Sequence, residues 1–468
     1  MKTISVEYAI IGAGTAGLGA YSVISRQTSS VVMVQDGPYG TTCARVGCMP
    51  SKLLITAAEH AHAATTSDFF GIKTEVQVDG PAVLKRLRRE RDERFVGRNL
   101  SYVAKIPAEH KVEGRAKFIA PGKLLVDEHT EIHAEKVIIA VGSRPTIDPI
   151  FDPISDQLLT SDTVFEIEDL PESIAVIGLG VIALELGQAL HRLGVKTTFF
   201  GRSGRVASLT HPDMQREALE TLSDELEIHP RGKVLRSWND NGAWIEYQTD
   251  SGETFTRCFE RVLVATGRTN NVDRLDLQAA GLSESTAAHP SFDSNLLNFP
   301  QAPVFIAGDA SETLTVWHQA FDEGRAAANN ALSYPQMKQV EPRTSLSIFF
   351  TDPQIALVGQ SYAQLKEKSI IVAESGFDSP RHWVWNKPKG RLQVYLDQTS
   401  GKILGAELLG YQAEHLAHTL ALAITHEMTA EQVLQMPIYH PTAEELLRDV
   451  LLSGEKQRRK KASSRPAA

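Results

Sequence analysis

The stretch Ala9-Ile10-Ile11-Gly12-Ala13-Gly14-Thr15-Ala16-Gly17 decides the fold of the first part of this chain. It reads as the end of an apolar strand followed by a glycine-rich turn that opens a helix. A second apolar strand at residues 31–34 leads to Gln35 and Asp36. In such a βαβ unit the glycines allow a tight turn, phosphates lie at the helix N-terminus, and a polar side chain meets a ribose. The stretch therefore predicts a dinucleotide site.

The same pattern occurs a second time. An apolar strand at residues 174–177 leads into Gly178-Leu179-Gly180, and residues 196–200 form the matching second strand. Two such units imply either two bound nucleotides or a duplication in which one copy has lost its site. Both copies keep their turn glycines, which favours two working sites. Glycines also follow three other predicted strands, each where the backbone must approach a ligand closely: Gly142, Gly267 and Gly308.

Two cysteines follow the first unit, in Cys43-Ala44-Arg45-Val46-Gly47-Cys48. This spacing allows a disulfide, because a short turn can bring the two Cα atoms within bridging distance. Pro50 follows, and proline favours the first turn of a helix. A thiol at a helix N-terminus lies at the positive end of the helix dipole, which favours its thiolate. The pattern indicates a redox pair, and the alternative is two ordinary buried cysteines beside a turn.

The size and composition describe an ordinary globular protein of about three domains, since it has 468 residues with 42% hydrophobic and 22% charged. A net charge of −9 argues against a nucleic-acid partner, and three cysteines are too few for a secreted disulfide scaffold. Glu7 interrupts any apolar leader, and no stretch approaches the ~18 apolar residues needed to span a bilayer. We therefore expect a cytoplasmic protein with no membrane partner.

The character of the chain changes from about Ser345. Strand-like residues 392–396 and 403–407 precede helical stretches at 413–426 and 443–452. Strands followed by helices predict a separate α+β domain. The last segment, 456–468, is rich in Lys and Arg, and we expect a disordered basic tail there.

Together these features resemble the FAD-dependent pyridine nucleotide–disulfide oxidoreductases, and among them the dihydrolipoamide dehydrogenases. The resemblance covers nearly the whole chain in the same order. It implies an α/β fold with two Rossmann-like domains, one for FAD and an inserted one for NAD(P), plus a C-terminal α+β dimerisation domain. The implied divisions are 1–147 and 269–341 for the FAD-binding parts, 148–268 for the NAD(P)-binding domain and 342–455 for the dimerisation domain.

The resemblance also implies catalytic roles. Cys48 would face the flavin, and Cys43 would exchange with the dithiol or disulfide substrate. Lys52 and Glu185 would form a pair beside the flavin.

A second implied catalytic group lies in Tyr439-His440-Pro441-Thr442-Ala443-Glu444-Glu445. Here His440 would be the acid/base, supplied across a homodimer to the other subunit, and Glu445 would orient it. Thiol–disulfide exchange proceeds through thiolates, so a base must take a proton and later return it. A carboxylate bonded to one ring nitrogen fixes the tautomer and stabilises the imidazolium.

The resemblance further implies the residues that contact the coenzymes, and no metal. For FAD these residues are Gly12, Gly14, Gly17, Gln35, Asp36, Thr42, Lys52, Gly142, Asp309, His318 and Ala320. For NAD or NADP they are Gly178, Gly180, Arg202, Arg205 and Gly267.

Two positions depart from the pattern of the family. Gln35 stands where an acid is usual, but its carbonyl can still accept a ribose hydroxyl, so we expect FAD binding to survive. NAD-specific members carry an acid where this chain has Gly201, and that acid repels a 2′-phosphate. Arg202 and Arg205 follow, and they are either partners of a 2′-phosphate or exposed loop arginines. The choice between NAD and NADP stays open.

The leading functional hypothesis is an enzyme that passes electrons between dihydrolipoamide or a related dithiol and a nicotinamide coenzyme, through Cys43–Cys48 and FAD. The alternative is an NADPH-dependent reductase of glutathione-like or other small disulfides, although Ser22 stands where glutathione reductases place an arginine. The C-terminal cysteine pair that a mercuric reductase or a large thioredoxin reductase would add is missing from the sequence. A hypothesis of another class is a docking component of a 2-oxoacid dehydrogenase complex.

Overall fold

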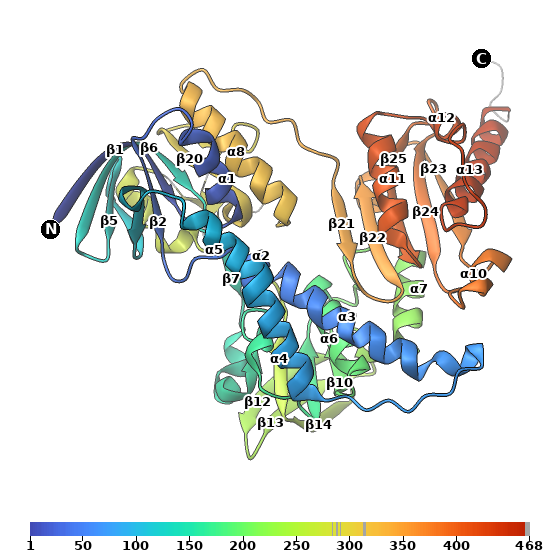
Figure 1. The fold of residues 1–468 in the computed structure, drawn as a ribbon. Helices are drawn as coiled ribbons and strands as arrows, with labels where there is room; N and C mark the ends of the chain where they lie inside the picture. Colours follow the sequence, from blue (N-terminus) through green and yellow to red (C-terminus); the bar gives the residue numbers. More distant parts are fainter. Residues whose placement is uncertain (283, 287–288, 291, 312–314, 464–468) are drawn as a thin grey trace.

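The computed structural model describes residues 1–282, 284–286, 289–290, 292–311 and 315–463. Figure 1 shows three sheet-based bodies: an N-terminal body on the left, a middle body below it, and a C-terminal body on the right. This arrangement confirms the predicted α/β fold with two nucleotide-binding units and a separate C-terminal domain. No helix in the described part of the chain is long and apolar enough to cross a membrane.

The N-terminal body contains a mostly parallel sheet. Its strands are β1 (Lys2–Ile11), β2 (Val31–Gln35), β3 (Lys111–Glu113), β4 (Ala116–Ala120), β5 (Lys123–Val126), β6 (Thr130–Ile139), β19 (Asn298–Phe299) and β20 (Val304–Ile306). The order across the sheet is β19-β20-β6-β1-β2-β3, and the hairpin β4–β5 joins it at β6. Side chains alternate along β1, so Tyr8 and Ile10 enter a core on one face, and Ala9 and Ile11 enter a second core on the other.

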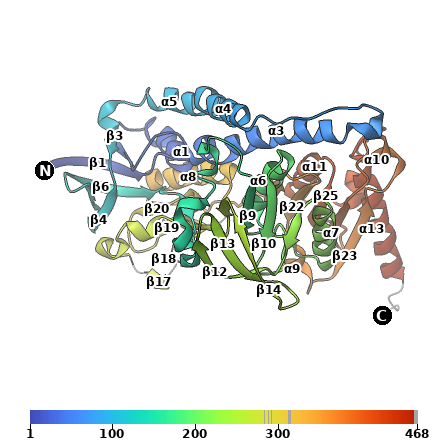
Figure 2. The same ribbon diagram turned by 90° about the horizontal axis from the view of Figure 1, so that it is seen from below.

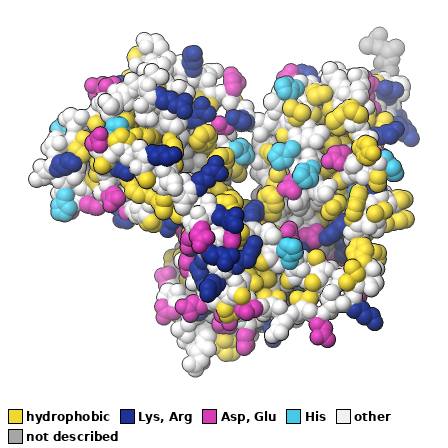
Figure 3. Space-filling view, in the orientation of Figure 1, with side chains coloured by type: hydrophobic (Ala, Val, Ile, Leu, Met, Phe, Trp, Pro, Cys, Tyr) yellow, Lys and Arg dark blue, Asp and Glu magenta, His cyan; other side chains and the backbone are white. Residues whose placement is uncertain are grey.

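Helices cover the first of these faces and extend away from it. The bounds are α1 (Thr15–Ile24), α2 (Thr42–Arg45), α3 (Cys48–Thr65), α4 (Gly80–Glu90), a π-helical η2 (Arg91–Val96), α5 (Gly97–Val103) and α8 (Trp317–Ser333). Short 3₁₀ turns are η1 (Ser67–Phe70), η3 (Ala108–His110), η6 (Val272–Arg274), η7 (Leu277–Ala280) and η8 (Gly308–Ala310). In Figures 1 and 2, α3 leaves the N-terminal body and reaches the C-terminal one. Figure 3 shows basic and acidic side chains intermixed over the region of α4.

The middle body repeats the βαβ plan with a parallel sheet in the order β11-β10-β9-β15-β8. These strands are β8 (Leu158–Leu159), β9 (Ser173–Ile177), β10 (Lys196–Phe200), β11 (Glu227–His229) and β15 (Arg261–Val264). An antiparallel sheet of β12 (Lys233–Asn239), β13 (Ala243–Gln248) and β14 (Thr254–Phe259) packs beside it. The helices are α6 (Val181–Arg192) and α7 (Pro212–Ser223), with 3₁₀ turns η4 (Pro149–Gln157) and η5 (Val164–Glu166).

The chain enters and leaves the middle body through two short strands that pair with each other. β7 (Ser143–Pro145) carries the chain out, and β16 (Arg268–Asn270) carries it back. The two strands are antiparallel partners, with Arg144 opposite Thr269. A further antiparallel pair of short strands, β17 (Glu284–Thr286) and β18 (His289–Pro290), lies in the returning part.

The C-terminal body is an antiparallel sheet in the order β21-β22-β25-β24-β23, covered by helices. The strands are β21 (Leu346–Phe349), β22 (Gln354–Gly359), β23 (Ile370–Gly376), β24 (Arg391–Asp397) and β25 (Ile403–Gly410). The helices are α9 (Tyr362–Leu365), α10 (Pro380–Val384), α11 (Ala413–Thr425), α12 (Ala430–Val433) and α13 (Glu445–Ser463).

The basic segment differs from the expected disordered tail, because α13 continues to Ser463. Arg458 donates to Glu455 on its own helix, and Arg459 donates to Glu431 at the start of α12. Leu451 and Gly454 of the same helix are buried. These contacts tie the first part of the segment to the body, and residues 464–468 lie outside the described residues.

Candidate active site

The two predicted redox cysteines lie on consecutive helices. Cys43 is in α2, where the side chain of Thr41 caps the helix by accepting from the N–H of Ala44. Cys48 is the first residue of α3, and the preceding Gly47 supplies no side-chain cap. The Cys48 sulfur therefore lies at the N-terminus of a long helix, as the sequence predicted. Both cysteines are free thiols in the structure.

The pKa values of the two thiols are shifted in opposite directions. A hydrogen bond from Cys43 is the largest influence on Cys48 and lowers its pKa to about 7, with the charge of Lys52 acting in the same direction. The same hydrogen bond, together with burial, raises the pKa of Cys43. Cys48 is thus the thiolate of the pair near neutral pH. Cys43 holds its proton, so its use as a nucleophile requires a base.

Lys52 and Glu185 come together as predicted. The Lys52 Nζ lies 2.6 Å from the Glu185 Oε2, although the two residues stand on α3 and α6 in different bodies. Glu185 is buried, with a side chain 7% exposed. Its other oxygen accepts the backbone N–H of Phe350 at 2.9 Å, and the Lys52 Nζ lies 4.2 Å from the centroid of the Phe350 ring. Sequence reasoning missed Phe350, which follows β21 in the C-terminal body.

His440 and Glu445 are also joined. The His440 Nδ1 lies 3.0 Å from the Glu445 Oε2, while the imidazole remains 78% exposed. Burial raises the pKa of Glu445, but the hydrogen bond with His440 and the N–H of Thr442 outweigh it, so the pKa is lowered. In Figure 1, α13 lies at the right edge of the molecule, far from α2 at its centre. Within one chain, the helix that begins at Glu445 therefore lies apart from the helix that carries Cys43.

The first glycine-rich turn fits a dinucleotide phosphate. Gly12 has φ +108°, and a Cβ there would lie 2.2 Å from the carbonyl oxygen of Ala140. A Cβ on Gly17 would lie 1.8 Å from the carbonyl oxygen of Gly12, so both positions require glycine. Gly14, the N-cap of α1, faces open space and leaves the first N–H groups of the helix available. This arrangement is what the FAD pyrophosphate needs.

Gln35 and Asp36 have partners that the sequence did not predict. The Gln35 Oε1 accepts the backbone N–H of Ala13 at 2.7 Å, so this side chain braces the glycine turn. Asp36 pairs with Arg115 at 2.8 Å. Both residues stand at the end of β2, where a ribose would lie.

The remaining residues predicted to contact FAD either follow strands of the parallel sheet or lie on helices. Asp309 follows β20 and accepts from the Ser143 hydroxyl at 2.7 Å, and a Cβ on Gly142 would face open space. Thr42 begins α2, and His318 and Ala320 lie in the first turn of α8. A further carboxylate was missed: Glu323 of α8 is 2% exposed and accepts the backbone N–H of Gly308 at 2.8 Å.

The second glycine turn has the same construction. Gly178 has φ +120°, and a Cβ there would lie 2.4 Å from the carbonyl oxygen of Ala265. Gly180, the N-cap of α6, and Gly267 both face open space. The turn therefore fits a second pyrophosphate.

The loop after β10 is basic and has no room for an acid at its first position. Gly201 is buried, and a Cβ there would lie 2.5 Å from Leu179 Cδ1 and 2.6 Å from the carbonyl oxygen of Pro230. Arg202 and Arg205 are exposed, and neither guanidinium forms an ion pair with any residue that the structure describes. The guanidinium of Arg231 lies against Gly204, with its Nε 2.9 Å from the position of a Cβ. Sequence reasoning missed Arg231, because it comes from beyond β11.

This pairing of two nucleotide-binding bodies with a dithiol defines a flavin-dependent disulfide oxidoreductase, and comparison with known proteins agrees. The chain belongs to the pyridine nucleotide–disulphide oxidoreductase family: residues 6–324 match the model of that family, and residues 345–450 match its dimerisation domain. The family uses FAD and NAD(P)H, and Cys43–Cys48 is the redox-active pair.

Relatives with different names match about equally well. A mercuric reductase of Staphylococcus aureus is 29% identical, over 91% of this chain and 78% of that one. A dihydrolipoyl dehydrogenase of Bacillus subtilis and a mycothione reductase of Mycobacterium tuberculosis are each 28% identical, over 95% of this chain and 98% of theirs. The HOCl-induced flavoprotein disulfide reductase RclA of Escherichia coli shares the fold, with TM-score 0.82 and 21% identity over 95% of this chain and 99% of that one. These comparisons establish the family but do not identify the substrate.

Proposed function

We propose that this chain is an NADPH-dependent reductase of a small disulfide. The observation that carries the proposal is the basic loop after β10. A buried Gly201 excludes the acid that would select NAD, and three guanidinium groups lie on the same loop or against it: Arg202, Arg205 and Arg231. Arginines recognise phosphate through paired charge-assisted hydrogen bonds. The 2′-phosphate of NADPH supplies that partner.

The exchange step follows from the acidities of the two thiols. In the reduced enzyme, Cys43 gives its proton to His440 and attacks the substrate disulfide, releasing one substrate thiolate and forming a mixed disulfide. The Cys48 thiolate then attacks Cys43, which forms the Cys43–Cys48 disulfide and releases the second thiolate. His440 returns the proton to a leaving thiolate. Bound FAD carries two electrons from the coenzyme to the Cys43–Cys48 disulfide and so restores the dithiol.

This scheme requires that His440 come from the second subunit of a homodimer. The separation of α13 from α2 within one chain supports that arrangement, as does the presence of a dimerisation domain.

Dihydrolipoyl dehydrogenase activity is the second candidate, and the full-length similarity to the Bacillus subtilis enzyme supports it. The same residues would then run in reverse, with a dithiol reducing the Cys43–Cys48 disulfide. A docking role in a 2-oxoacid dehydrogenase complex would be an added property, and co-purification with an acyltransferase core would reveal it.

The deciding experiment measures both directions with both coenzymes. The substrates are NADPH and NADH with oxidised glutathione, lipoamide and a mixed panel of low-molecular-weight disulfides, and NAD⁺ and NADP⁺ with dihydrolipoamide. We expect turnover with NADPH and a disulfide. Rapid reduction of NAD⁺ by dihydrolipoamide, with no preference for NADPH, would overturn the proposal in favour of the second candidate.

Substitutions of the arginines test directly whether the loop after β10 binds the 2′-phosphate. Arg231→Ala and Arg202→Ala should each raise the KM for NADPH by about tenfold or more, since a charge-assisted hydrogen bond contributes about 1.5–3 kcal/mol. The KM for NADH should not change. Arg236→Ala is the matched control, because Arg236 pairs with Glu246 on the neighbouring sheet, away from the loop.

A further inference from the structure

Phe350 makes two separate contacts with the Lys52–Glu185 pair. Its backbone N–H donates to the Glu185 Oε1 at 2.9 Å, and its ring lies beneath the Lys52 ammonium at 4.2 Å. The Lys52 Nζ in turn bonds the other Glu185 oxygen at 2.6 Å. Three groups thus form a closed set in which each touches the other two. The pair stands on the N-terminal and middle bodies, whereas Phe350 belongs to the C-terminal body.

The orientation of Lys52 matters for the redox pair. Cys48 and Lys52 are four residues apart on α3, so their side chains share one face of the helix. The charge of Lys52 lowers the pKa of Cys48, and the charge of Glu185 raises it. How near the ammonium lies to the thiol, and how fully it is paired with the carboxylate, therefore affects how readily the thiolate forms. Lys52 is 32% exposed, so without the ring its flexible side chain could turn toward water.

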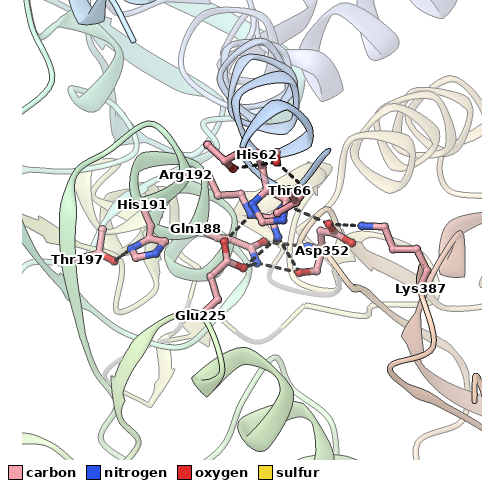
Figure 4. Close-up of polar contacts among 10 residues, drawn as sticks. His62, Thr66, Gln188, His191, Arg192, Thr197, Glu225, Asp352 and Lys387 are labelled. Carbon is pink, nitrogen blue, oxygen red and sulfur yellow. Dashed lines mark hydrogen bonds and ion pairs between the residues drawn. The ribbon is translucent and has the colours of Figure 1, made fainter. Parts of the chain in front are cut away.

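A network of buried polar contacts holds Phe350 in place, and Figure 4 shows most of it. Glu185, Gln188 and Arg192 lie along one stripe of α6. Gln188 accepts the N–H of Asp352 and donates to its carbonyl oxygen, both at 2.9 Å. Arg192 bonds the Asp352 carboxylate at 3.2 Å. The stripe thus grips the backbone of residues 350–352.

The same network is closed from two other sides. Glu225, just beyond α7, accepts from Arg192 at 2.6 Å and from Gln188 at 3.0 Å. Lys387 of the C-terminal body donates to the Asp352 carboxylate at 2.8 Å. The Arg192 side chain is 6% exposed, so this is a buried junction and not a set of surface pairs. Residues 350–352 are therefore held by α6 of the middle body and by Lys387 of the C-terminal body.

We propose that Phe350 is a positioning residue for the redox pair, holding the Lys52 ammonium beside Cys48 through its ring and the Glu185 carboxylate through its backbone. By this route the dimerisation domain contributes to the electrostatic environment of thiols that belong to another body. The inference rests on the redox pair of the family and is independent of the coenzyme and substrate proposed above.

The test is a pH titration of the holoenzyme after anaerobic two-electron reduction, read as the long-wavelength charge-transfer absorbance between the Cys48 thiolate and FAD. Phe350→Leu and Phe350→Met keep an apolar side chain and the backbone N–H but lose the aromatic face. We expect the midpoint to rise by about half to one pH unit, which lowers the thiolate fraction at pH 7 about two- to fivefold. Phe350→Tyr keeps the ring and should titrate like the wild type.

Two further variants separate positioning from simple packing. In a Lys52→Met background, adding Phe350→Leu should shift the midpoint no further, because the ring acts through the ammonium. Phe259→Leu is the matched control, since Phe259 also lies under a cation, Arg257, but in the middle body. It should leave the midpoint unchanged. Bound FAD and the thermal midpoint of each variant show whether it has folded.

Several outcomes would contradict the proposal. A folded, FAD-loaded Phe350→Leu or Phe350→Met enzyme that titrates like the wild type would refute it. So would a shift of equal size in the Lys52→Met background, which would mean that Phe350 acts by packing alone. A Phe350→Tyr enzyme that shifts as far as Phe350→Leu would refute it as well.

Discussion

Glu445 holds His440 through the imidazole Nδ1, with its two carboxylate oxygens at 3.1 and 3.0 Å. This leaves Nε2 as the ring nitrogen that can exchange a proton with a thiol. The carboxylate also accepts the N–H of Thr442 and lies 3.7 Å from Arg381, so its own position is fixed. The geometry matches a histidine base oriented by an acid.

Loss of that carboxylate should slow exchange without affecting coenzyme binding. We expect Glu445→Gln to reduce kcat for disulfide reduction by about ten- to a hundredfold, since general base catalysis contributes about 10²–10⁴ in rate and an amide orients the ring less well. The KM for the coenzyme should be unchanged. Glu444→Gln is the neighbouring control. Wild-type turnover in Glu445→Gln would show that His440 needs no carboxylate.

Heterodimers test whether the site is shared between subunits. When Cys43→Ser and His440→Ala chains are co-expressed with different tags, a shared site predicts that the mixed dimer keeps one intact site of two. About half of the wild-type activity per dimer should then return, although each homodimer is inactive. A mixed dimer as inactive as its parents would place both residues in the same subunit's site. The measurement is steady-state turnover of the doubly purified dimer.

Because the two thiols share a hydrogen bond, replacing Cys48 should change the pKa of Cys43. In Cys48→Ser the neighbouring thiolate is lost, so the raised pKa of Cys43 should fall back toward the ordinary value of a cysteine. The pH dependence of Cys43 alkylation measures this change. Cys258→Ser, which removes a cysteine of the middle body, should have no effect. An unchanged Cys43 profile in Cys48→Ser would contradict the observed coupling.

The buried junction should contribute strongly to stability. Arg192→Met leaves the carboxylate of Glu225 without its buried guanidinium partner and removes one of the two cations that pair with Asp352, and we expect a loss of about 3–5 kcal/mol in the free energy of unfolding. Urea denaturation of the holoenzyme measures it. Arg216→Met removes an exposed pair with Asp213 and should cost less than about 1 kcal/mol. Equal losses of stability for the two variants would show that the buried junction contributes no more than an exposed ion pair.

Two substitutions in the loop after β10 separate charge from space. Ser203→Glu places an acid at an exposed position and should raise the KM for NADPH without loss of stability. Gly201→Glu must displace both the Leu179 side chain and the Pro230 carbonyl, so it should lower the thermal midpoint and should not create a preference for NADH. A stable Gly201→Glu enzyme with a switched preference would contradict this account of the loop.

The residues that sequence reasoning found share one property: their chemistry depends on near neighbours in the chain. The two glycine turns, the Cys43–Cys48 pair and the His440–Glu445 pair each lie within one local motif. The roles of both the His440–Glu445 pair and the Lys52–Glu185 pair came from the family resemblance, and the second pair is not local, since its residues come together from different bodies.

The residues that were missed depend on how distant segments pack. Phe350 reaches Lys52 from another body, and Arg231 reaches Gly204 across the end of the sheet. No periodicity or spacing in the sequence encodes such contacts. The sequence predicts that the Gln35 carbonyl accepts a hydrogen bond from a ribose hydroxyl. In the structure this carbonyl accepts from the backbone N–H of Ala13, because the glycine turn places that N–H within its reach.

The pairing of β7 with β16 gives the middle body the character of an exchangeable module. Both covalent links to the rest of the chain run through adjacent strands, about 5 Å apart, so replacement of the whole segment must satisfy only one local geometry. Recombination between relatives could thus trade one coenzyme preference for another without disturbing the thiols. The α6 stripe of Glu185, Gln188 and Arg192 sets the condition, because any incoming module must still grip residues 350–352.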